Sequence, residues 1–246
     1  MGSTRKKQTV AVETSLSPLA VTGRSFSTFL ERPLLYLVLG LLSVLPAIIV
    51  ENAARITPLD PHLAVRLLNM ICGALISAAM ASAVFQSFLG RELGLMEALG
   101  EGLASFANLA ILALLVNILI FLGALLLIFP GVIVACMCFV AVPVCVVETR
   151  PPTDSAIRSI NLTHGYRLNV LPFIIIYFAG IFFLPKLGVT TAKTFFAGNE
   201  TAGIIIADLF LVPLNIYYGL AAALSYSDLR LIKEGVTADM LATDES

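Results

Sequence analysis

Charged residues are scarce in this sequence. Asp, Glu, Lys and Arg make up 13% of its 246 residues, whereas an average soluble domain has about 25%. A surface with so little charge is not that of a soluble protein, and the mean hydropathy of +0.96 agrees. The composition therefore favours an integral membrane protein.

An excess of basic residues is also lacking. The 15 Lys and Arg residues are balanced by 16 Asp and Glu residues, which leaves a net charge of −1. A protein that binds nucleic acid needs a basic face. We therefore expect no nucleic-acid partner.

Residues that bind metals or act as nucleophiles are few. His62 and His164 lie in loops on opposite sides of the predicted membrane, so they do not form a catalytic pair. The cysteines lack the CxxC spacing and nearby His residues of a zinc site. We expect no metal and no cofactor, and we interpret four residues as small membrane-buried side chains: Cys72, Cys136, Cys138 and Cys145.

Apolar residues come in long runs, and Asp208 is the only charged residue inside them. A helix needs about 20 apolar residues to cross the hydrocarbon core of a bilayer. The runs cover residues 33–50, 67–90, 102–147, 168–185 and 201–227. The third run is long enough for two helices, so the sequence predicts six transmembrane helices.

The distribution of Lys and Arg predicts the orientation. Most of these residues fall in segments on the same side as the N-terminus, and such segments are usually cytoplasmic. With an even number of spans, both termini are expected in the cytoplasm. We expect disordered tails at residues 1–23 and 236–246 and one membrane domain at residues 24–235.

Each odd-numbered span follows a short amphipathic stretch on the predicted cytoplasmic side. Such a stretch can lie among the headgroups with its apolar face towards the bilayer. The fold class predicted is thus all-α and polytopic, with six transmembrane helices as three hairpins, each preceded by a short amphipathic helix. The alternative is that any multispan protein has amphipathic loops. The apolar positions are Phe26, Phe29 and Leu30, then Leu89, Leu93, Met96, Leu99 and Leu103, then Ala156, Ile157 and Ile160.

Charged residues gather at the predicted inner ends of the spans. Glu148 ends the fourth span, Arg158 and Arg167 flank the next amphipathic stretch, and Asp228 and Arg230 end the sixth span. One interpretation is that these charges set the topology and form ion pairs. The other is a site for anionic lipid headgroups, because arginine at a leaflet surface suits phosphate recognition. On this second interpretation, Arg158, Arg167 and Arg230 are the candidate ligands.

Polar residues within the spans are also few. Asp208 is the only charged one, and a transport path would run past Asp208, Asn117 and Asn215. Asparagine in a membrane helix more often donates hydrogen bonds to a neighbouring helix. Both interpretations stay open.

Short motifs follow one another along the second half of the chain. Pro130-Gly131 is a strong turn signal and predicts the outer turn between the third and fourth spans. Gly165 is placed to end an interfacial helix in a left-handed conformation. The motif residues are Pro130, Gly131, Pro143, Glu148, Ser159, Gly165 and Asp228.

This ordered set resembles the membrane domain in front of some bacterial glycerophosphodiester phosphodiesterases, and the related stand-alone YciC-like inner-membrane proteins. The matching segments are residues 128–131, 162–165 and 226–230, together with Pro143 and Glu148. The resemblance runs from about residue 24 to residue 235. It implies a bacterial inner-membrane protein without enzymatic activity, since the activity of that family belongs to a separate soluble domain.

The expected function follows from the resemblance and the sparse polar chemistry. We expect a non-enzymatic protein of the bacterial inner membrane that interacts with lipids or acts as a scaffold or accessory subunit. Its expected partners are membrane lipids and other membrane proteins of a complex. A small-molecule or ion transporter is the alternative.

Overall fold

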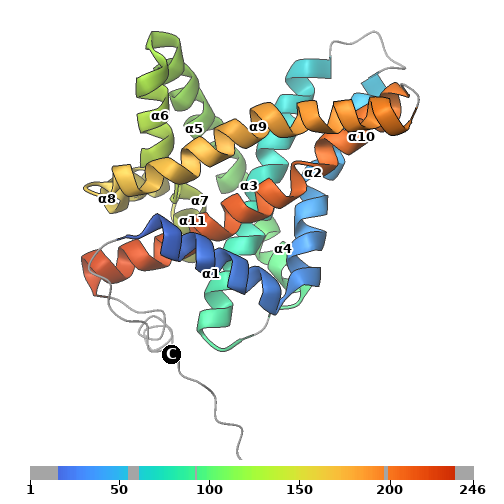
Figure 1. The fold of residues 1–246 in the computed structure, drawn as a ribbon. Coiled ribbons are helices and arrows are strands. Elements are labelled where there is room, and N and C mark those ends of the chain that lie inside the picture. Colours follow the sequence, from blue (N-terminus) through green and yellow to red (C-terminus); the bar gives the residue numbers. More distant parts are fainter. Residues whose placement is uncertain (1–15, 55–60, 92, 197–198, 236–246) are drawn as a thin grey trace, which may run out of the picture.

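Every regular element of the described chain is a helix (Figure 1). The computed structural model describes residues 16–54, 61–91, 93–196 and 199–235. The helices are α1 (Pro18–Glu31), α2 (Pro33–Ala54), α3 (Pro61–Phe88), α4 (Leu95–Ala104), α5 (Phe106–Leu126), α6 (Ile128–Met137), α7 (Ala141–Val147), α8 (Pro152–Thr163), α9 (Arg167–Phe195), α10 (Glu200–Leu209) and α11 (Val212–Glu234).

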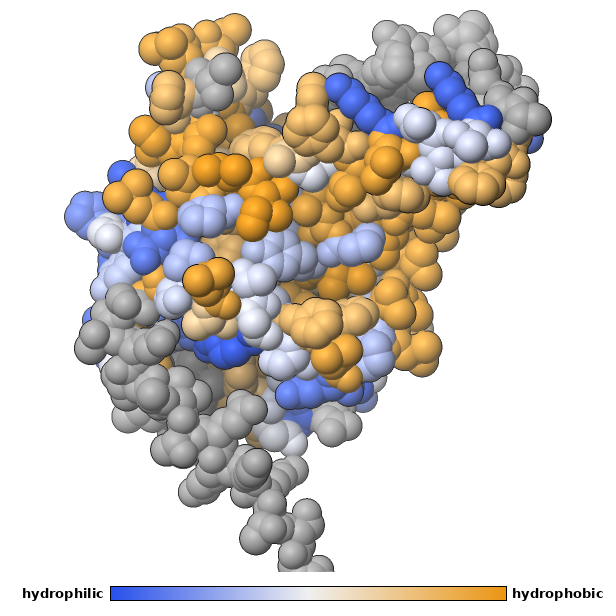
Figure 2. Space-filling model, viewed as in Figure 1, coloured by the Kyte–Doolittle hydropathy of each residue, from blue (hydrophilic) through white to orange (hydrophobic). Residues whose placement is uncertain are grey.

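Six of the helical segments are long and apolar enough to cross a membrane, which confirms the predicted polytopic all-α fold. They are Pro33–Glu51, Met70–Phe88, Phe106–Leu126, Phe129–Val147, Arg167–Phe195 and Thr201–Glu234. Apolar side chains cover much of the surface in Figure 2, whereas hydrophilic residues gather over α8, near α1 and at the far end of α9. Such an apolar exterior suits contact with lipid.

The spans pack as three hairpins in chain order. α2 packs on α3, α5 on α6, and α9 on α10. α11 continues the sixth span into the middle of the molecule, where it contacts α1, α2, α3, α7, α8 and α9. Its residues from Gly219 to Tyr226 are all buried. The core therefore forms around α11, and the hairpins surround it.

Two of the spans are interrupted. The fourth consists of α6 and α7 and the sixth of α10 and α11. Pro143 lies in the first turn of α7, and Pro213 lies in the first turn of α11. Proline has no backbone N–H and its ring clashes with the preceding turn, so each proline interrupts the helical hydrogen bonds just before it. The apolar runs did not reveal these breaks.

The turn between the third and fourth spans lies three residues earlier than predicted. Leu127 is extended, with φ −168° and ψ 151°, and separates α5 from α6. Pro130 and Gly131 lie in the first turns of α6, where a missing N–H costs nothing. An added Cβ on Gly131 would lie 2.9 Å from the backbone nitrogen of Ala124, so this glycine serves close helix packing.

The amphipathic helices precede the odd-numbered spans as predicted, but their bounds differ. α1 begins at Pro18, inside the predicted tail 1–23, because buried Leu16 and Val21 attach this segment to the bundle. The Asn169 side chain also donates a hydrogen bond to the carbonyl of Leu16. The remainder of that tail, residues 1–15, and the tail 236–246 lie outside the described residues.

The outer faces of these helices carry large apolar side chains, and the faces packed on the bundle carry mostly small ones. α8 buries Ser155, Ser159 and Thr163, whereas Ile157 is 57% exposed. α1 likewise buries Val21 and leaves Phe26 and Leu30 exposed, and α4 begins only at Leu95 and leaves Met96 exposed. Small side chains permit close packing on the bundle, so the large apolar ones are left to face outward.

Candidate functional site

Charged side chains from three helices meet at one end of the bundle. Glu148 follows α7, Arg158 lies on α8, and Arg230 and Glu234 lie on the last turns of α11. Successive spans alternate in direction, so this end also holds the starts of α2, α5 and α9. We call it the charged end.

The local sequence explains why Glu148 sits at a corner. α7 ends at Val147, and Thr149 takes a positive φ of 47°. Pro151 and Pro152 then start α8, since proline suits the first position of a helix. The chain reverses within these few residues and places α8 beside the end of α7.

Glu148 is the centre of the ion pairs, and only 9% of its side chain is exposed. Arg150 donates through Nε at 2.6 Å and Arg158 through Nε at 3.3 Å. The hydroxyl of Tyr226 donates to Oε1 at 3.0 Å, and Arg230 Nε lies 4.0 Å from the same oxygen. These charge-assisted hydrogen bonds fix the position of the carboxylate between the three helices.

Glu234 is the second carboxylate of the network. Arg158 pairs with it through Nη2, and Arg230 donates to it through Nε at 3.2 Å. Burial lowers the pKa of Arg158, but its hydrogen bond to Glu234 and the charge of Glu148 outweigh burial and raise that pKa above its usual value. Three arginines against two glutamates leave this network with one positive charge.

Neutral hydrogen bonds fix α8 against the broken span. The break before α7 leaves the carbonyl of Met137 without its helical partner, because Ala141 donates to Cys138 instead. Ser159 Oγ, which is fully buried, donates to that carbonyl at 2.8 Å, and Thr163 Oγ1 lies at 3.3 Å. The motif residue Ser159 thus satisfies a backbone group that the span itself cannot.

Gly165 turns the chain from α8 into α9. His164 has φ −61° and ψ 126°, and Gly165 has a φ of 89°. Tyr166 donates its backbone N–H to the carbonyl of Thr163 at 2.9 Å, which completes a type II turn. The predicted left-handed glycine at the end of α8 is confirmed.

Asp228 also has a defined role. Arg24 of α1 donates through Nη1 to Oδ1 of Asp228 at 2.9 Å, and it donates through Nη2 to Oδ2 of the same carboxylate. The planar guanidinium thus binds the carboxylate through two nitrogens, a geometry that favours arginine over lysine. The pair attaches α1 to α11, so Asp228 is a docking point for the first amphipathic helix.

The three predicted headgroup ligands have different environments. Arg158 and Arg230 are neutralised by Glu148 and Glu234, in line with the ion-pair interpretation. Arg167 differs, because its Nε is buried without a hydrogen-bond partner. Lys233, whose ammonium donates to the carbonyl of Asn161, is close enough for Arg167 to repel it. Of the three candidates, Arg167 is the one that is not paired with Glu148 or Glu234.

Sequence reasoning did not identify the network partners Arg150, Tyr226 and Glu234, or the pairing of Arg24 with Asp228. The spacing of Arg230 and Glu234, four residues apart on one helix, is a signal that predicts their pairing. No comparable signal links Arg24 to Asp228, since they are 204 residues apart.

The polar residues within the spans do not come together in a single path. Asn215 donates to Ser43 Oγ at 3.0 Å and joins α11 to α2 as an interhelical bond. Asn117 donates to the carbonyl of Ala113 in its own helix. Oδ2 of Asp208 is buried without a hydrogen-bond partner. Only Asp208 thus retains an unsatisfied polar group in the predicted set.

Within the described residues, no group of three His, Cys, Asp or Glu side chains is placed to hold a metal ion. The four cysteines are free thiols, and all but Cys72 are buried. Neither a family model, a curated protein nor a solved structure matches the chain.

Proposed function

We propose that this chain is a non-enzymatic protein of the bacterial inner membrane that binds anionic lipid headgroups at its charged end. In this role it serves as a scaffold or accessory subunit of a membrane-protein complex. Both termini face the cytoplasm, where anionic headgroups and positively charged loops attract each other.

The observation that carries the proposal is the environment of Arg167. The Arg167 residue is half-buried, and its Nε is buried without a hydrogen-bond partner within the protein, which is unfavourable for a polar group. The adjacent network cannot supply one, because Glu148 and Glu234 are engaged by Arg158 and Arg230. A phosphate from a lipid headgroup supplies acceptors of the required charge at this depth.

Two further features support the assignment. Three amphipathic helices, α1, α4 and α8, precede odd-numbered spans and expose large apolar side chains, among them Phe26, Met96 and Ile157. Such side chains suit insertion among acyl chains next to the headgroups. The motif resemblance to the membrane domain of bacterial phosphodiesterases supports the location and the absence of an enzymatic role.

The test is the lipid content of the purified protein. Lipids and proteins that co-purify with the parent are measured by mass spectrometry, together with Arg167→Gln and, as a matched control, Arg91→Gln. Arg91 is an exposed arginine at the same end, after the second span. We expect enrichment of anionic lipid in the parent and the control but not in Arg167→Gln. A parent without enriched anionic lipid and without a stoichiometric protein partner would contradict the proposal.

The second candidate is a small-molecule or ion transporter, and Asp208 is the observation that favours it. Its Oδ2 is buried without a partner inside the sixth span, and ionisable residues at such depth often serve ion or proton pathways. Flux into liposomes is measured for the parent and for Asp208→Asn, with Asp154→Asn as the control. A transporter that uses this carboxylate loses its flux in Asp208→Asn alone.

A further inference from the structure

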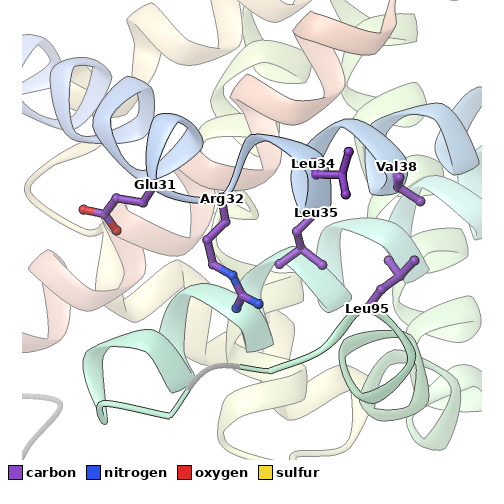
Figure 3. Close-up of a pocket in the computed structure, with 6 residues that line it drawn as sticks. All are labelled: Glu31, Arg32, Leu34, Leu35, Val38 and Leu95. Carbon is purple, nitrogen blue, oxygen red and sulfur yellow. The ribbon is translucent and has the colours of Figure 1, made fainter.

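A pocket of about 360 Å³ lies where α1 passes into α2, beside the start of α4. It is lined by Glu31, Arg32, Leu34, Leu35, Val38 and Leu95 (Figure 3). Leu34 is 77% exposed, so the pocket opens onto the outer, apolar surface of the bundle. Its lining thus carries the charged residues Glu31 and Arg32 at one end and apolar side chains along the rest.

Arg32 provides the basic end. Its Nη1 is buried and has no hydrogen-bond partner, which is unfavourable for a cation. Glu31 does not compensate it, since Figure 3 shows the carboxylate of Glu31 pointing away from the guanidinium of Arg32. The charge of Arg32 is therefore available to a ligand.

The start of α2 adds further donors for an anion. The first N–H groups of a helix have no acceptor within the helix and carry partial positive charge. Leu34 and Leu35 belong to the first turn of α2 and line the pocket. Together with Arg32 they make a surface suited to a phosphate.

Arg167 occupies the equivalent place in the third hairpin. Each arginine lies where an amphipathic helix passes into the following span: Arg32 is between α1 and α2, and Arg167 is the first residue of α9. Each has one buried guanidinium nitrogen without a partner. The repeated placement indicates that an unpaired arginine at this junction is a feature of the fold and not of one loop.

We infer that the pocket at Arg32 binds an anionic phospholipid, with the phosphate on Arg32 and the start of α2 and an acyl chain along Leu34, Leu35, Val38 and Leu95. The ligand class rests on the proposed lipid-binding function, but the site is separate from Arg167 and the ion-pair network. A free phosphate shares the same recognition chemistry at Arg32 and lacks the contacts with the three leucines and the valine.

The absence of Trp from the chain permits a direct test. Leu34→Trp places one indole at the pocket, and Leu187→Trp places one at an exposed position elsewhere on the bundle. Each variant of the full chain is reconstituted with phosphatidylglycerol or phosphatidylcholine that carries bromine on its acyl chains, and quenching of fluorescence is measured. We expect phosphatidylglycerol to be preferred roughly fivefold at the pocket, as for one basic side chain at an anionic surface, and no preference at Leu187→Trp.

Replacement of the arginine then identifies the cause. Arg32→Gln in the Leu34→Trp background should abolish the preference, whereas Arg32→Lys should retain part of it, with both variants checked for unchanged helix content. Equal quenching by the two lipids at Leu34→Trp overturns the inference. Inorganic phosphate and short-chain phosphatidylglycerol are each added as competitors. If inorganic phosphate abolishes the quenching preference and short-chain phosphatidylglycerol does not, the ligand is free phosphate and the lipid assignment is wrong.

The outcome can be separated from that of the proposed function. If the parent retains anionic lipid but Arg32→Gln leaves the quenching preference unchanged, only the inference about the pocket is wrong. A parent without anionic lipid contradicts the proposed function, whatever is measured at Leu34→Trp.

Discussion

The hydroxyl of Tyr226 donates a hydrogen bond to Oε1 of Glu148 over 3.0 Å, although the two residues are 78 positions apart. The same hydroxyl accepts a hydrogen bond from Nη1 of Arg230 at 3.0 Å. Tyr226 thereby links the end of the fourth span to the sixth span and orders the network between them. Several consequences of this arrangement are measurable.

Glu148→Gln should destabilise the bundle. The substitution removes one of the two carboxylates that Arg158 and Arg230 share and leaves Glu234 as the remaining one, at a cost of about 3 kcal/mol in unfolding free energy. Unfolding in mixed micelles, followed by far-UV circular dichroism, measures the change. The control Asp154→Asn removes an exposed carboxylate and should cost less than about 1 kcal/mol. Equal effects of the two substitutions would refute the central role of Glu148.

Gly188→Ala should force α9 and α10 apart. An added Cβ would lie 2.6 Å from Cα of Ala207, a backbone atom that cannot rotate away. Overpacking of this kind costs about 1–3 kcal/mol. Gly73→Ala is the matched control in another span, because nothing lies within 4 Å of its added Cβ. Thermal unfolding should show a loss for Gly188→Ala and no loss for Gly73→Ala, and the prediction fails if both behave alike.

Ser159→Ala combined with Thr163→Val should weaken the attachment of α8. The pair removes both hydroxyls that lie within hydrogen-bond distance of the Met137 carbonyl. An unsatisfied buried carbonyl costs about 1–3 kcal/mol. Either single substitution should cost less, since the other hydroxyl remains in reach. Ser27→Ala removes an exposed hydroxyl that bonds within its own helix and is expected to leave stability unchanged.

Arg24→Asp should weaken the packing of α1 on α11, and the charge-reversed double variant should restore it. Arg24→Asp alone places two carboxylates together and weakens docking by about 1 kcal/mol, a modest value because the Arg24 side chain is 37% exposed. Faster exchange of the backbone amide hydrogens of residues 18–31 should report this weaker docking. The double variant Arg24→Asp/Asp228→Arg should recover slow exchange. If it does not, the pair is not what holds α1 to α11.

The local sequence pattern predicted some structural features correctly and others incorrectly. The run of apolar residues from 102 to 147 predicted two spans, and both are present as Phe106–Leu126 and Phe129–Val147. Pro130-Gly131 did not mark the turn, because a proline and a glycine also suit the first turns of a closely packed helix. The left-handed Gly165 was predictable because its conformation depends on the residue itself.

The network at the charged end was only partly predictable. Arg158 and Arg230 were identified as residues of interest, but whether they were free for lipid or engaged in ion pairs depended on Glu148 and Glu234. Arg32 was not among the predicted ligands, since its unpaired nitrogen and its pocket exist only after α1, α2 and α4 pack together.

The sequence by itself determined the number of spans, the hairpin order and the presence of surface helices before the odd spans. These follow from the length of apolar runs and from helical periodicity, both properties of neighbouring residues. The tertiary structure decided which charges are neutralised and which remain available, as at Arg158 and Arg167. Charge compensation depends on distances between residues far apart in the chain, and those distances exist only in the packed bundle.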